Sequence, residues 1–82
     1  MDFNCIIYTN ATYDEAKALS VDGEIIMTGD YYHDKIDTLI RGFFYGLEYA
    51  GFTIIVEEVS LHPSDELFEA CGFINEGEGD LE

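Results

Sequence analysis

The sequence predicts one small α+β domain in which an antiparallel sheet of three or four strands packs on one long helix, followed by a short C-terminal helix and an acidic tail. Two patterns indicate this class: alternating apolar and polar segments flank an Asp-Gly turn, and a central segment repeats apolar residues at spacings of three and four. A chain of 82 residues has room for one core, and 48% hydrophobic residues are too many for a disordered chain. We expect residues 1–74 to form the domain and residues 75–82 a flexible tail.

The N-terminal part predicts a strand followed by a hairpin. Phe3–Thr9 alternates with apolar side chains on both faces. Residues 12–19 can be interpreted in two ways, because the Thr-Tyr-Asp-Glu sequence at 12–15 matches a capping box that opens a helix. We favour the other interpretation, a strand ending at Val21, since Asp22-Gly23 supplies the positive φ angles of a type I′ turn. Glu24–Thr28 is then the second strand of the hairpin.

The strongest helical pattern runs from about Tyr31 to Ala50. Asp30 is the expected N-cap, and Gly51 is expected to end the helix in the left-handed conformation. The apolar stripe that should face the core consists of Ile36, Leu39, Ile40, Phe43, Leu47 and Ala50.

Two glycines interrupt this helix. Gly42 and Gly46 each cost about 1 kcal/mol relative to alanine, and with Thr38 they form a ridge of small side chains. Such a ridge permits close packing within the chain or a contact between two copies, and the sequence leaves both alternatives open.

The C-terminal part predicts a strand at Phe52–Leu61, expected in the centre of the sheet, and a short helix that starts near Pro63 and ends at Gly72. The long helix can cover one face of the sheet only. The C-terminal segment either shields the other face or leaves it to bind a partner. The side chains concerned are Ile6, Tyr8, Ile26 and Ile55.

Several functional classes can be set aside. No apolar stretch approaches the roughly 20 residues of a membrane span, and no signal segment is recognised, so we expect a cytoplasmic protein. Cys5 and Cys71 are expected to be free thiols. No nucleophile elbow, phosphate-binding loop or His-Glu-x-x-His motif occurs, so neither an enzyme nor a cofactor is expected. His33 and Asp37 lie one helical turn apart, but acidic residues there are typical of helix capping, and no metal site is predicted.

Charge is the most informative property. The 18 Asp and Glu residues outnumber Lys17, Lys35 and Arg41 and leave a net charge of −15, which repels phosphate and argues against direct nucleic-acid binding. A domain of this size has a diameter of roughly 30 Å, hence about one net charge per 2 Å, against about one per 1.7 Å of axis for DNA. A protein with a basic duplex-binding cleft should therefore attract this chain. The expected contact residues are Asp30, Tyr31, Tyr32, Asp34, Asp37, Tyr45, Glu48, Glu57 and Glu58.

In size, charge and order of elements the chain resembles the small acidic α+β proteins by which bacteriophages inhibit host DNA-binding enzymes, including CRISPR effector nucleases, restriction enzymes and uracil-DNA glycosylase. The resemblance implies a DNA-mimicking inhibitor of anti-CRISPR or anti-restriction type. Its partner would be a basic nucleic-acid-binding protein in the host cytoplasm. The alternative is a small acidic interaction or regulatory module, paired as a homodimer, that has no nucleic-acid enzyme as its target.

Overall fold

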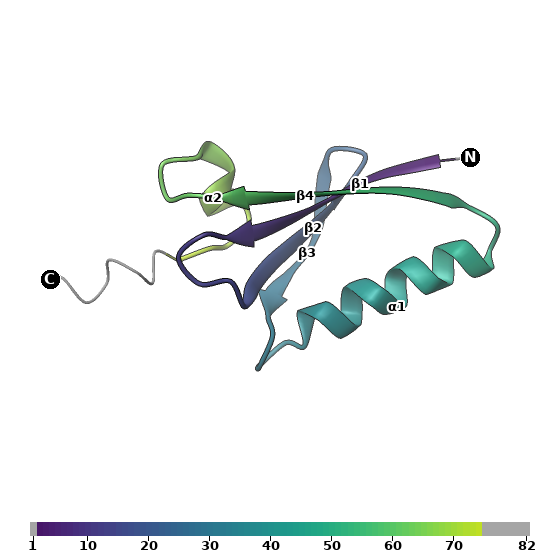
Figure 1. Ribbon diagram of the computed structural model, residues 1–82, viewed down its shortest axis with the longest axis horizontal. Coiled ribbons are helices and arrows are strands. Elements are labelled where there is room, and N and C mark those ends of the chain that lie inside the picture. Colours follow the sequence, from purple (N-terminus) through teal and green to yellow (C-terminus); the bar gives the residue numbers. More distant parts are fainter. Residues whose placement is uncertain (1, 75–82) are drawn as a thin grey trace, which may run out of the picture.

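The computed structural model describes residues 2–74, which form an α+β domain (Figure 1). The α+β class is therefore confirmed, as are the long helix and the short C-terminal helix. Neither helix is long and apolar enough to cross a membrane. The tail predicted at 75–82 lies outside the described residues. Along the chain the elements are β1 (Asp2–Asn10), β2 (Ala16–Val21), β3 (Glu24–Asp30), α1 (Ile36–Tyr49), β4 (Thr53–Leu61) and α2 (Glu66–Ala70).

The sheet is mixed, with strand order β3-β2-β1-β4. β2 pairs antiparallel with both β1 and β3, as the hairpin predicts, but β4 pairs parallel with β1. The expectation of a purely antiparallel sheet is therefore wrong. The reason is that α1 carries the chain back across the sheet from one edge to the other, so β4 runs in the same direction as β3 and β1. β4 is consequently an edge strand and not the central strand expected.

The β2–β3 hairpin confirms the interpretation favoured for residues 12–21. Asp22 and Gly23 have φ angles of 51° and 92°, both positive as a type I′ turn requires. The pairing shifts within the hairpin, because Leu19 lies opposite Met27 whereas Ser20 lies opposite Ile25. The extra residue of this β-bulge is Ile26, which is 43% exposed.

The long helix starts later than predicted, at Ile36 and not near Tyr31. The prediction that Asp30 is the N-cap is wrong, because Lys35 precedes the helix and makes no side-chain cap bond. Asp30 Oδ1 instead accepts hydrogen bonds from the backbone N–H groups of His33 and Asp34 at 2.6 and 3.2 Å. These bonds close a separate turn, because Lys35 has a left-handed conformation with φ 53° that interrupts the helical path. The end of the helix matches the prediction, with φ 96° at Gly51.

Two apolar clusters lie on opposite faces of the sheet. On one face, α1 packs Ile36 and Ile40 against Cys5 and Leu19. On the other, α2 and the segment after it cover the end of the sheet nearest to them. This second cluster consists of Tyr8, Ala18, Leu61, Phe68, Cys71 and Phe73.

The C-terminal segment shields the second face only in part. Tyr8 is buried and Ile6 is half-buried, whereas Ile55 remains 50% exposed. Ile26 also stays exposed, because the bulge displaces it from the regular alternation of the strand. The middle of β4 is therefore uncovered on this face.

The glycine ridge of α1 does not pack within the described chain. A Cβ atom added at Gly42 or Gly46 would have no neighbour within 4 Å among residues 2–74. Around the ridge, the outer side of α1 exposes Tyr45 and Tyr49 to solvent. Leu39 is also 50% exposed, so the prediction that it faces the core is wrong. Within residues 2–74 the ridge is therefore not used for internal packing, and a contact between two copies remains a prediction.

Candidate functional site

Most of the described carboxylates lie at one end of the sheet. β1, β3 and β4 end there and β2 begins there, so the loops at 11–15, 31–35 and 62–65 come together (Figure 1). We call this region the acidic end. It holds eight of the fourteen Asp and Glu residues between positions 2 and 74, which are Asp14, Glu15, Asp30, Asp34, Asp37, Asp65, Glu66 and Glu69.

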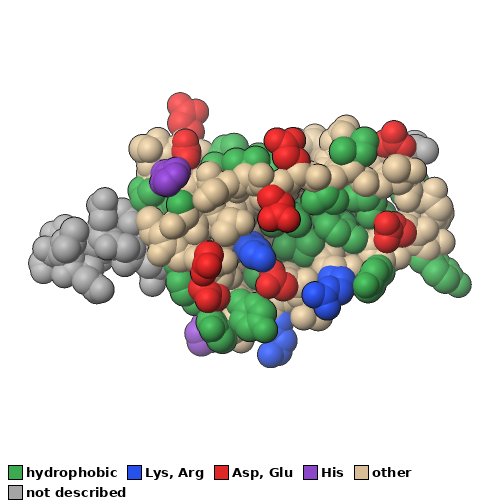
Figure 2. Space-filling model, in the orientation of Figure 1, with side chains coloured by type: hydrophobic (Ala, Val, Ile, Leu, Met, Phe, Trp, Pro, Cys, Tyr) green, Lys and Arg blue, Asp and Glu red, His purple; other side chains and the backbone are tan. Residues whose placement is uncertain are grey.

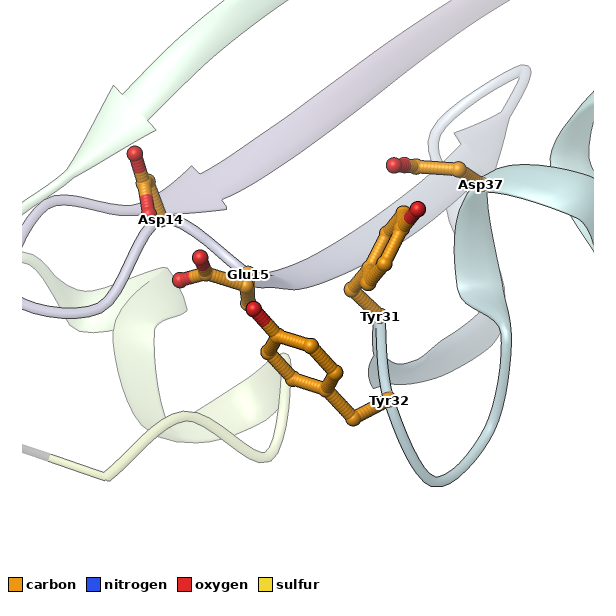
Figure 3. A pocket seen from close by; sticks show the side chains of 5 residues that line it. All are labelled: Asp14, Glu15, Tyr31, Tyr32 and Asp37. Atoms are coloured by element: carbon orange, nitrogen blue, oxygen red, sulfur yellow. The ribbon is translucent and has the colours of Figure 1, made fainter.

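Two tyrosines form the centre of the acidic end. The rings of Tyr31 and Tyr32 meet edge to face with centroids 5.1 Å apart, and the side chains are 52% and 61% exposed. With Asp14, Glu15 and Asp37 they line an open pocket of about 360 Å³ (Figure 3). The backbone N–H of Tyr31 donates to the Glu15 carbonyl at 2.9 Å, so the two loops that supply the pocket are fixed to each other.

Electrostatic repulsion is built into this pocket. A side-chain hydrogen bond with Asp14 raises the pKa of Glu15, and burial and repulsion by the same carboxylate act in the same direction. Two adjacent carboxylates repel each other when both are charged. An Arg or Lys side chain placed between them would therefore be bound favourably.

Other carboxylates of the acidic end already have partners within the chain. Asp37 Oδ1 forms an ion pair with Lys17 Nζ at 2.8 Å, which offsets part of its charge. Asp34 Oδ2 accepts a hydrogen bond from the backbone N–H of Asp30 at 3.0 Å, and Asp30 accepts from the Asp34 N–H in return. These contacts fix the positions of the three carboxylates.

The structure divides the nine predicted contact residues among three places. Five lie together at the acidic end: Asp30, Tyr31, Tyr32, Asp34 and Asp37. Tyr45 and Glu48 are exposed on α1, nearer its C-terminal end. Glu57 and Glu58 are exposed in the middle of β4, where successive side chains point to opposite faces.

Sequence reasoning missed five members of the acidic end. Asp14 and Glu15 were interpreted only as capping-box residues, and Asp65 and Glu66 only as residues at the start of the short C-terminal helix, whereas Glu69 was not considered. Asp14 and Glu15 directly precede the start of β2, and the acids around α2 come after the end of β4. Once a parallel pairing of β1 and β4 is recognised, these positions must share one end of the sheet.

Basic side chains are few and local. Figure 2 shows the Lys and Arg side chains gathered near the first half of α1, while the carboxylates on the same view are separated by backbone and apolar groups. Lys17 and Lys35 belong to the same end of the sheet as the eight carboxylates and offset part of their charge. On the face drawn in Figure 2 the carboxylates do not form one unbroken ribbon.

Cys5 and Cys71 are both buried and unpaired by a disulfide. Burial raises the pKa of each thiol, and Asp22 adds to the effect at Cys5. Raised pKa values make these thiols poor nucleophiles. Within residues 2–74, His, Cys, Asp and Glu side chains nowhere form a group of three suited to hold a metal ion.

Comparison of the chain with protein-family models, with curated proteins and with solved structures finds no match. The acidic end is therefore defined by its own geometry, namely two loops joined by a backbone hydrogen bond, an exposed tyrosine pair and a set of carboxylates around it.

Proposed function

We propose that the protein is a stoichiometric DNA-mimicking inhibitor that occupies the nucleic-acid-binding cleft of a host defence or DNA-processing enzyme, such as a CRISPR effector nuclease. The observation that supports this function best is the gathering of eight carboxylates at the acidic end. Arg and Lys side chains that bind phosphates also form charge-assisted hydrogen bonds with carboxylates. The chain would act by occupancy alone and needs no catalytic group.

The net charge of −15 supports a fast, salt-sensitive encounter with a basic partner. Long-range attraction would bring the acidic end to the cleft, and the exposed rings of Tyr31 and Tyr32 would then pack at the centre of the contact. Tyrosine is enriched among the residues that contribute most to interface affinity.

The fixed loops favour tight binding. The hydrogen bond between Tyr31 and Glu15 and the reciprocal bonds between Asp30 and Asp34 hold the acidic end in one arrangement before binding. A preorganised surface loses less conformational entropy on association than a flexible one.

A charge-matched pair of triple variants tests this function. Asp14→Asn, Glu15→Gln and Glu66→Gln remove three charges from the acidic end. The control variant removes three charges elsewhere, at positions outside the predicted contact set, through Asp2→Asn, Asp22→Asn and Glu24→Gln. Both are added to purified CRISPR effector and restriction enzymes, and cleavage of a duplex substrate is measured at about 50 and about 200 mM salt.

We expect the acidic-end variant to inhibit about tenfold less well than the control, because each exposed pair contributes up to about 1 kcal/mol. Inhibition should decrease as salt rises, and excess duplex DNA should displace the chain from the enzyme. Equal loss in both variants would place the contact elsewhere. Failure to inhibit any enzyme of the panel would argue against DNA mimicry.

One observation favours a second function, the dimeric interaction module. The outer side of α1 exposes Leu39, Tyr45 and Tyr49 beside two uncovered glycines, and this side carries Arg41. Two copies could approach there with their acidic ends apart. Light scattering after size exclusion distinguishes the two functions, since the inhibitor is expected to be a monomer that binds a basic enzyme.

A further inference from the structure

The free edge of β4 is the longest regular strand edge that the described chain leaves unpaired. β4 pairs with β1 along all nine of its residues, and no described strand lies on its other side. In Figure 1 it is the strand nearest the viewer, with β3 at the far edge. β3 is shorter and carries the bulge at Ile26, which disturbs its pairing edge, whereas β4 has no bulge.

The side chains of β4 leave this edge accessible from both faces. Ile55 and Val56 are 50% and 44% exposed although they point to opposite faces of the sheet. Glu57 and Glu58 are exposed as well. Neither α1 nor the segment around α2 therefore covers the middle of the strand.

An open edge of this kind selects an extended backbone. Its unpaired N–H and C=O groups repeat with the period of a strand and match only another strand. β4 contains neither Pro nor Lys, two residues by which natural edge strands prevent pairing. The acidic pair at its centre is the one charged feature of the strand.

The charges of Glu57 and Glu58 also determine which kind of strand can pair with the free edge of β4. If a second copy paired antiparallel about Glu57, at the centre of β4, the Glu57 side chains of the two copies would lie directly opposite each other. Like charges directly opposite each other destabilise a strand pair, and β4 has no basic residue to offset them. A partner strand with Lys or Arg at two successive central positions would instead place one cation beside each carboxylate, one on each face.

We propose that the outer edge of β4 binds an extended basic segment of a partner protein by strand addition. Apolar side chains of the segment would flank its central basic pair and pack beside Ile55, Val56 and Val59. Binding at β4 does not require that the partner recognise nucleic acid, and it uses no residue of the acidic end, so the two sites can fail independently.

Peptide binding followed by NMR tests this edge. The probe is a nine-residue peptide of alternating Thr and Val with two central Lys residues, and its control carries two Glu residues instead. We expect the Lys peptide to bind and to slow hydrogen exchange at alternate amides of β4, while amides of the acidic end are unchanged. The double variant Glu57→Lys/Glu58→Lys should bind the Lys peptide with an affinity lower by about tenfold or more, and it should bind the Glu peptide instead.

A matched variant, Glu24→Lys/Glu48→Lys, makes the same change in net charge away from β4 and should keep the original preference. Circular dichroism checks that both variants retain the fold. The proposal is overturned if the Lys peptide fails to bind at millimolar concentration, or if the two variants respond alike. Sedimentation showing a dimer of the wild-type chain with protected β4 amides would assign the edge to a second copy and would equally overturn it.

Discussion

Gly29 lies directly against Asp34, so close that a Cβ atom added to the glycine would be 2.7 Å from the Asp34 Cβ. The contact exists because Asp34 folds back to accept the N–H of Asp30, which follows the glycine in the chain. The loop that carries Tyr31 and Tyr32 thus depends on the absence of a side chain at position 29.

Gly29→Ala should therefore destabilise the domain by about 1–3 kcal/mol, the usual cost of forcing extra volume into a packed site. Urea denaturation followed by circular dichroism measures the change. Gly23→Ala is not a suitable control, because Gly23 has a positive φ of 92°, so Gly42→Ala serves instead. An unchanged midpoint for Gly29→Ala would mean that Asp34 does not hold this position.

Asn10 connects the end of β1 to the C-terminal segment. Its side chain is buried, donating from Nδ2 to the Ile74 carbonyl at 2.8 Å and accepting from the Thr12 N–H at 2.9 Å. Asn10→Ala should cost about 1–3 kcal/mol, because buried polar groups lose their partners. Asn4→Ala, at an exposed position, should cost much less in the same denaturation experiment, and equal costs would contradict the role of Asn10.

The glycines of α1 give opposite expectations for a monomer and for a dimer. In a monomer, Gly42→Ala and Gly46→Ala should each stabilise the helix by about 0.5–1 kcal/mol, since both positions are exposed and open. In a dimer that uses this face, the same substitutions should weaken association. Thermal melting at two protein concentrations separates the cases, and a loss of stability only at the higher concentration would favour the dimer.

The carboxyl pair in the pocket predicts a pH dependence. The hydrogen bond with Asp14 raises the pKa of Glu15 above its ordinary value of 4.5, so protonated Glu15 favours the folded state. Its stabilising contribution is complete below the unfolded pKa and is lost as the pH rises through the folded one. Glu15→Gln should therefore raise the melting temperature at pH 7 and leave it nearly unchanged at about pH 4, where the wild-type group is protonated.

Glu66→Gln is the control for this effect, because it removes the same charge from the acidic end outside the pair. Its gain at pH 7 should be smaller, reflecting only the general relief of repulsion at a net charge of −15. The interpretation fails if the melting temperatures of the two variants rise equally at pH 7, or if Glu15→Gln still melts at a higher temperature than the wild type at low pH.

Local chemistry was predictable from the sequence, whereas strand direction was not. Asp22-Gly23 and Gly51 have the positive φ angles that their residue types indicate. The start of α1 was misplaced because Asp30 caps a turn that Lys35 then interrupts, and no local rule favours a left-handed lysine. The direction of β4 depends on where α1 delivers the chain, which is a property of the whole sheet.

The candidate site shows the same division. Asp30 and Asp34 were identified from the acidic pattern before the long helix, and Tyr31 as an exposed aromatic residue beside them. Asp14 and Glu15 join them only through the strand order, which brings a loop from the first hairpin beside the start of α1. A local sequence pattern does not predict which distant segments lie side by side in the fold.

The bulge in β3 gives the molecule two unlike sheet edges. Copies with two regular edges could stack one after another, each joining the next, and grow into a filament without a natural end. Here the additional residue at Ile26 shifts the backbone hydrogen-bonding groups of β3 out of regular register. The β4 edge of a second copy therefore could not pair with β3 along its whole length. Edge-to-edge polymerisation through these two edges would therefore be interrupted at its first step.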